Sequence, residues 1–157
     1  YKSQDHQSNM STKLFKIIGI WTLFVVVAIL NAAIREHLLA PMIGHKLALP
    51  FSGIMLSIFI FLITIRMLSF LKISNSLELW LVGIFWVMLT LAFELLFGHY
   101  VIGESWGKLF EVFNILEGNL FLLVLFVTAC SPYIAAKIRT LIYEARQMNR
   151  AGRSNQI

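Results

Sequence analysis

The sequence has little cysteine and little charge. Because Cys130 is the one cysteine, an intramolecular disulfide and a redox-active cysteine pair are both excluded. This cysteine lies in an apolar run. Charged residues make up 13% of the chain, whereas a soluble domain typically has about a quarter. Hydrophobic residues make up 59% of the 157 positions. This composition predicts an integral membrane protein with a few spans and no sizeable soluble domain.

Sequence signatures of the common enzyme classes are also missing. The chain has no Gly-rich phosphate loop, no nucleophile with a base and an orienting group, and no pair of histidines at helical metal-binding spacing. The Glu-x-x-His motif of metal-binding helical bundles is absent, as is any internal repeat. We therefore favour a protein that is not an enzyme, and we assign no catalytic residue, metal or cofactor.

Four apolar runs are long enough to cross a membrane. They cover about residues 14–34, 51–71, 77–97 and 115–134. A helix of about 20 residues, rising about 1.5 Å per residue, spans the roughly 30 Å hydrocarbon core. Before the last run, Ser105 is a plausible helix cap, and Trp106, Leu109 and Phe110 recur on one helix face. We predict an all-α, four-helix transmembrane bundle with a short interfacial amphipathic helix before the fourth span.

The rest of the chain divides around this membrane domain, which we place at residues 10–136. Residues 1–9 are polar and precede Met10, so we expect a disordered or non-native leader there. Residues 137–157 are rich in Lys and Arg and form a basic tail. The first apolar run exceeds the roughly 7–15-residue core of a signal peptide, which favours an uncleaved helix.

The basic residues predict the orientation of the four spans. Of the 13 Lys and Arg residues, Arg35, Lys46 and Lys108 fall on one side of the predicted membrane, and the other ten fall on the opposite side. Basic segments stay in the cytoplasm, so we predict a multi-pass protein of the inner (plasma) membrane with both termini cytoplasmic. Because these charges sit at the ends of spans, the net charge of +5 predicts contact with the lipid bilayer and no nucleic-acid partner.

Polar and ionisable residues gather at the extracytoplasmic end of the predicted spans. Such residues are costly in lipid and are expected to face the bundle interior. Asn31 and Arg35, four residues apart, share a helix face, and Glu94 lies near the end of the third span. We predict a binding site or a buried polar network formed by Asn31, Arg35, Glu36, Glu94, His99, Asn114, Glu117 and Asn119.

Several interpretations of this polar cluster stay open. It is a structural network, in which Arg35 pairs with Glu94 or Glu117, or it binds a small molecule or proton, with these two carboxylates titrating. A subunit of a small transporter or channel assembly is an alternative, which requires a homo-oligomer or a partner membrane subunit. A metal- or haem-binding membrane enzyme is another. The ligands of a metal would come from His37, His45, His99, Glu36, Glu94 and Glu117, and a haem would lie between His37 and His99.

One block of the sequence carries a resemblance. Residues 94–106 read E-x3-GHY-x2-G-x-SW, residues 114–118 read N-x-L-x-G, and residues 31–36 read N-x3-RE. Over roughly residues 10–135, the chain resembles a group of small, uncharacterised bacterial membrane proteins. The resemblance implies four helices and an inner-membrane location, and it implies no activity. A basic residue expected after the last glycine of the pattern is replaced by Asn119, which puts a charge pairing at that position in doubt.

Overall fold

A computed structural model describes residues 2–73, 75–113 and 119–154, with side chains except at residues 2–9, 112 and 151–154. These residues are helical apart from short turns, which confirms the predicted all-α fold. Four helices are long and apolar enough to cross a membrane, and they indicate an integral protein of the lipid bilayer. They are Met10–Ile43, His45–Leu71, Ser76–Tyr100 and Phe121–Arg150.

The first spanning helix continues further than the apolar run that predicted it. Helix α1 (Lys2–Ile34) passes through a π-helical turn, η1 (Arg35–Leu39), into the short α2 (Ala40–Ile43). Gly44 then ends the helix with a backbone φ of 79°, a value that residues with a Cβ rarely adopt. The predicted connection between the first two spans is therefore mostly helical, and α3 (His45–Leu71) starts directly after Gly44.

Helices α3 and α4 are joined by a tight turn. Lys72 ends α3 in the left-handed conformation, with a φ of 50°. Helix α4 (Ser76–Tyr100) begins with Asn75 as its cap, because the Asn75 Oδ1 atom accepts a hydrogen bond from the Leu77 amide at 3.0 Å. Pro50 lies inside α3, close enough to its start that the missing amide donor disturbs only one early turn.

The predicted short helix before the fourth span is present as α5 (Trp106–Phe110), followed by the 3-10 turn η2 (Glu111–Phe113). The fourth long helix, α6 (Phe121–Ser154), starts later than the predicted residue 115. Asn119 precedes this helix, and its Oδ1 atom accepts a hydrogen bond from the Phe121 amide at 3.1 Å. Asn119 thus lies at the start of α6 instead of within it.

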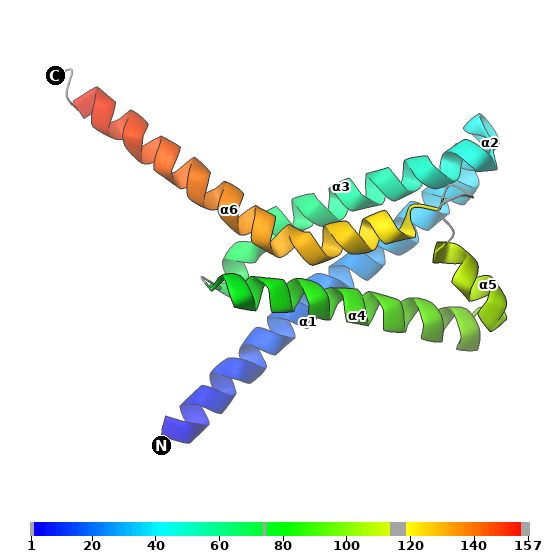
Figure 1. The fold of residues 1–157 in the computed structure, drawn as a ribbon, viewed down its shortest axis with the longest axis horizontal. Coiled ribbons are helices and arrows are strands. Elements are labelled where there is room, and N and C mark those ends of the chain that lie inside the picture. Colours follow the sequence, from blue (N-terminus) through cyan, green and yellow to red (C-terminus); the bar gives the residue numbers. More distant parts are fainter. Residues whose placement is uncertain (1, 74, 114–118, 155–157) are drawn as a thin grey trace.

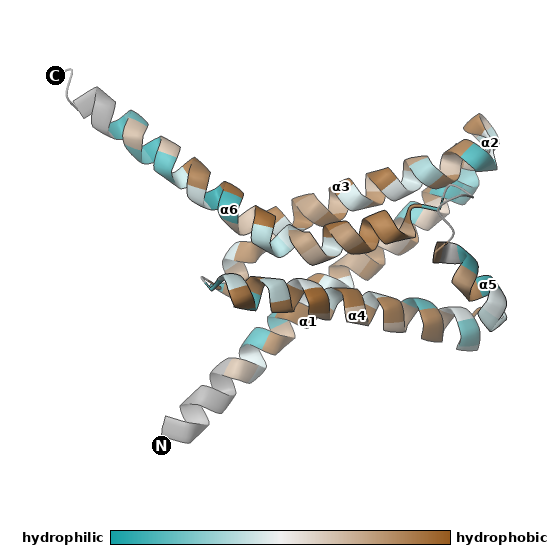
Figure 2. Ribbon diagram, viewed as in Figure 1, coloured by the Kyte–Doolittle hydropathy of each residue, from teal (hydrophilic) through white to brown (hydrophobic). Residues whose placement is uncertain are grey.

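The four long helices form an elongated bundle (Figure 1). The start of α1, the α3–α4 turn and the end of α6 lie at one end, which we call the terminal end; α2 and α5 lie at the other, the cap end. Helix α6 packs against both α3 and α4, and α1 packs mainly against α3. Hydrophobic residues dominate the middle of the bundle, and hydrophilic residues gather on the projecting part of α6 (Figure 2).

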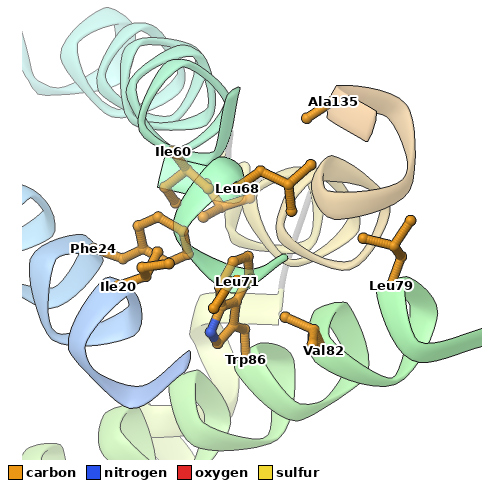
Figure 3. Close-up of a cluster of buried hydrophobic side chains, with 10 residues drawn as sticks. Ile20, Phe24, Ile60, Leu68, Leu71, Leu79, Val82, Trp86 and Ala135 are labelled. Atoms are coloured by element: carbon orange, nitrogen blue, oxygen red, sulfur yellow. The ribbon is translucent and has the colours of Figure 1, made fainter. Parts of the chain in front are cut away.

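A hydrophobic core lies in the middle and the terminal half of the bundle. Figure 3 shows Phe24 from α1, Ile60 from α3 and Trp86 from α4 converging there. The Trp86 ring is fully buried, and its Nε1 atom donates to the Ile17 carbonyl at 2.9 Å. At Gly83, an added Cβ would lie 2.0 Å from the Ala129 carbonyl oxygen, so the glycine allows α4 and α6 to touch through their backbones.

Candidate functional site

A cavity of about 320 Å³ lies between the four long helices, from the middle of the bundle toward the cap end. Helices α1, α3, α4 and α6 and the turn η1 all contribute to its wall. Its polar lining residues are Asn31, Arg35, Thr90, Glu94 and Asn119. Four of these five residues belong to the polar cluster that the sequence predicts.

Aromatic side chains form much of the remaining wall. The Trp21 ring meets the Phe93 ring edge to face, with centroids 6.1 Å apart, and the Trp21 Nε1 atom donates to the Thr90 hydroxyl at 3.1 Å. Phe24 and Phe121 also line the cavity. The Trp21 contacts hold α1 against α4 near mid-bundle, and the two helices diverge from there toward the cap end (Figure 1). This divergence leaves the space that the core fills elsewhere.

Asn31 is buried, with 5% of its surface exposed, and its hydrogen bonding is incomplete. Its Nδ2 atom donates to the Ser52 carbonyl at 3.1 Å. That contact fixes the orientation of the amide, because a carbonyl oxygen can only accept. The Asn31 Oδ1 atom has no hydrogen-bond partner, which costs about 1–3 kcal/mol for a buried acceptor.

The two charged residues of the cavity wall differ in their partners. The Arg35 Nε atom lies 3.0 Å from the Glu36 carboxylate. Glu94 is partly buried, and no ion pair within 4.0 Å joins it to another residue of the described ranges. Glu94 interacts at longer range with Arg35 and with Glu104. The Arg35–Glu94 ion pair of the structural-network interpretation is therefore not formed, because Arg35 pairs with its neighbour in sequence.

His99 lies outside the cavity lining, at the corner between α4 and α5. Its Nδ1 atom is 2.9 Å from the Glu104 carbonyl oxygen, and its ring stacks on Trp106 with centroids 4.2 Å apart. The Glu104 carboxylate lies 2.7 Å from the Lys108 ammonium group, and this hydrogen bond raises the pKa of Lys108. These contacts hold α5 against the end of α4.

The structure therefore brings together part of the predicted cluster. Asn31, Arg35, Glu94 and Asn119 share the cavity, and Glu36 reaches it only through its ion pair with Arg35. The predicted residues Asn114 and Glu117 lie outside the described residues. Thr90 and the aromatic wall were not among the predicted site residues. The signal for Thr90 was its position four residues before Glu94, which places both on one helix face.

A metal centre has no support in the described ranges, where no group of three His, Cys, Asp or Glu side chains is placed to hold a metal ion. The chemistry that the cavity offers is instead hydrogen bonding, charge and aromatic contact. The chain matches no protein-family model, no curated protein and no solved structure, so the likeness to small bacterial membrane proteins stays a prediction.

Proposed function

We propose that this protein binds a small molecule in the cavity, from the extracytoplasmic side of the inner (plasma) membrane. The terminal end carries the two ends of the chain and the α3–α4 turn, where ten of the 13 Lys and Arg residues fall in the sequence. The positive-inside rule then supports a cytoplasmic terminal end. The cavity, which extends toward the cap end, faces outward in this orientation.

The observation that carries the binding function is the unpartnered Asn31 Oδ1 atom in the cavity wall. Buried polar atoms in folded proteins almost always have partners, and exceptions call for an explanation. A purely structural network would complete the hydrogen bonds of Asn31 and pair the charge of Glu94. In this protein, a donor supplied by the contents of the cavity completes the hydrogen bonds of Asn31 instead.

The dimensions of the cavity fit this function. Its volume of about 320 Å³ is near the lower limit of ligand pockets, which typically run from about 300 to 1,000 Å³. Its wall is largely apolar and aromatic with a few convergent polar groups, as in most small-molecule sites. Core residues such as Trp86 lie on the terminal side of the cavity, so this arrangement supports binding more directly than passage across the membrane.

Two substitutions separate a binding site from a structural network. Asn31→Leu removes the amide and Glu94→Gln removes the charge, and each keeps the number and branching of the side-chain heavy atoms. If the groups serve a ligand, the purified variants should melt close to or above the temperature of the unaltered protein. In Asn31→Leu the removal of an unsatisfied acceptor offsets the loss of the hydrogen bond to Ser52, and in Glu94→Gln a partly buried charge is removed. A large drop in melting temperature for both variants would support the structural network and contradict the binding function.

The orientation has its own test. A green fluorescent protein fused after residue 157 should fluoresce, because this reporter folds in the cytoplasm, and the same reporter inserted after Gly103 should stay dark. The opposite pattern would place the cavity on the cytoplasmic side.

A further inference from the structure

We infer that the ligand of this cavity is a small organic cation, a protonated amine that carries an apolar group. This inference rests on the proposed binding function and names its ligand class. It comes from the balance of charge in the wall, from the direction of the remaining hydrogen bonds and from the aromatic lining.

The charge balance of the wall is negative at Glu94. Arg35 and Glu94 are its two charged lining residues, but Arg35 is already paired with Glu36 at 3.0 Å. Glu94 lacks such a pair within the described ranges, and the neighbouring Glu104 is itself paired with Lys108. A carboxyl group within a membrane span is accommodated by protonation, by a counter-charge or by water. A ligand cation supplies this counter-charge.

Two acceptor groups of the cavity wall lack a hydrogen-bond partner in the described ranges. The Asn31 NH₂ group is committed to the Ser52 carbonyl, and the Thr90 hydroxyl donates to the Trp86 carbonyl at 2.8 Å. These two groups are the Asn31 Oδ1 atom and the Glu94 carboxylate, and the Arg35 and Asn119 side chains add donors to the same wall. An ammonium group has three donors and no acceptor, so it complements both acceptors.

The aromatic lining suits the same ligand. Trp21, Phe24, Phe93 and Phe121 line the cavity, and the faces of such rings attract cations with about 0.5–2 kcal/mol. These rings also receive the apolar group of the ligand. A volume of about 320 Å³ accommodates a molecule with one ring or a short alkyl chain.

Three probes of the same shape and different charge test the inference. They are benzylamine (protonated at neutral pH), benzyl alcohol (neutral) and benzoate (anionic), each titrated into the purified full-length protein and followed by saturation-transfer NMR. We expect benzylamine to bind at least about tenfold more tightly than benzyl alcohol, and benzoate not to bind. This series needs no variant, so a folding defect cannot obscure it.

Variants then locate the charge. Glu94→Gln should weaken benzylamine binding at least about tenfold, and Glu36→Gln should weaken it less, because it releases the positive charge of Arg35 toward the cavity. Glu78→Gln is the matched control, since Glu78 pairs with Lys13 at 3.6 Å outside the cavity lining, and it should bind benzylamine unchanged.

The outcomes distinguish the ligand class from the binding function. Preference for benzoate, equal binding of all three probes, or binding of none overturns the inferred cation. The binding function itself is judged separately, by the melting temperatures of Asn31→Leu and Glu94→Gln. Unchanged benzylamine affinity in Glu94→Gln would also overturn the inference, because the probe would then bind elsewhere.

Discussion

The two halves of the bundle treat their buried polar groups differently. In the terminal half, the Thr64 hydroxyl donates to the Ile60 carbonyl at 2.8 Å and lies 3.2 Å from the Ser131 hydroxyl. In the cap half, the Asn31 Oδ1 atom lacks a partner, alone among the buried side-chain polar atoms that the structure describes. Both halves contain buried polar groups, so the candidate site is distinguished by incomplete hydrogen bonding and not by polarity alone.

Helix separation accounts for this difference. Gly83 brings α4 into backbone contact with α6 at Ala129, and no space remains between the two helices at that point. Toward the cap end, α1 leaves α4 after the contacts of Trp21, and a cavity opens. Polar groups in the tight half must therefore satisfy one another, whereas those around the cavity depend on what fills it.

Closing the tight half further should have the largest effect. In Gly83→Ala the new Cβ would lie 2.0 Å from the Ala129 carbonyl oxygen, and backbone atoms must shift to make room. We expect a loss of about 3 kcal/mol or more, at the upper end of overpacking effects, seen as a large drop in melting temperature. Gly19→Ala is the control, because nothing lies within 4 Å of its new Cβ. Equal melting of the two variants would contradict the tight contact.

Enlarging an alanine in each half should give effects of opposite sign. Ala135 is fully buried in the core, so Ala135→Leu should cost about 1–3 kcal/mol through overpacking. Ala28 lines the cavity, so Ala28→Leu has room, and it should leave the melting temperature unchanged or raise it while blocking benzylamine. Equal destabilisation by both substitutions would show that the cavity is as tightly filled as the core.

A smaller effect is expected from the hydroxyl pair between α3 and α6. Thr64→Val keeps the shape of the side chain and removes its contact with Ser131. Interhelical hydrogen bonds in membranes average about 0.6 kcal/mol, so the melting temperature should fall slightly, in contrast to Asn31→Leu. A double-mutant cycle with Ser131→Ala measures the coupling free energy between the two hydroxyl groups. A value of zero would show that this pair does not stabilise the bundle.

The smallest effect should come from the exposed ion pair of α5. The hydrogen bond and charge of Glu104 raise the pKa of Lys108, so the folded form holds this proton more tightly than the unfolded form. Its contribution to stability is present at neutral pH and is lost as the pH rises above the ordinary range of a lysine pKa. The unaltered protein should therefore melt slightly above Lys108→Gln at neutral pH, and this difference in melting temperature should shrink at strongly alkaline pH. Lys46→Gln, outside this pair, should show no such convergence.

The sequence predicted the fold well because length and apolarity alone specify spanning helices. It also predicted the short helix after Ser105, since the cap and the apolar face are local signals. The starts of α3 and α6 were less predictable. The second span was predicted to begin at residue 51, after Pro50, but α3 begins at His45 and accommodates the proline near its start. The fourth span was predicted to include Asn119, but this residue precedes α6.

The candidate site was predictable in its residues and not in its bonding. The cost of polar groups in lipid predicts Asn31, Arg35 and Glu94 as site residues from the sequence alone. Sequence could not show that Arg35 pairs with Glu36, or that α1 and α4 diverge beyond Trp21, because both depend on how the helices cross. The unpartnered oxygen of Asn31 follows from that same crossing.

Thiol labelling of single cysteines measures how accessible each half of the bundle is to a soluble reagent. Single cysteines at Ala28, in the cavity wall, and at Thr128, which is 1% exposed in the packed part of α6, are introduced into a Cys130→Ser background. With a water-soluble cationic thiol reagent such as aminoethyl methanethiosulfonate, we predict rapid labelling at position 28, slowed by benzylamine, and protection at position 128. Protection at both positions, or equal labelling of both, would contradict a bundle that is packed around position 128 and open to a ligand around position 28.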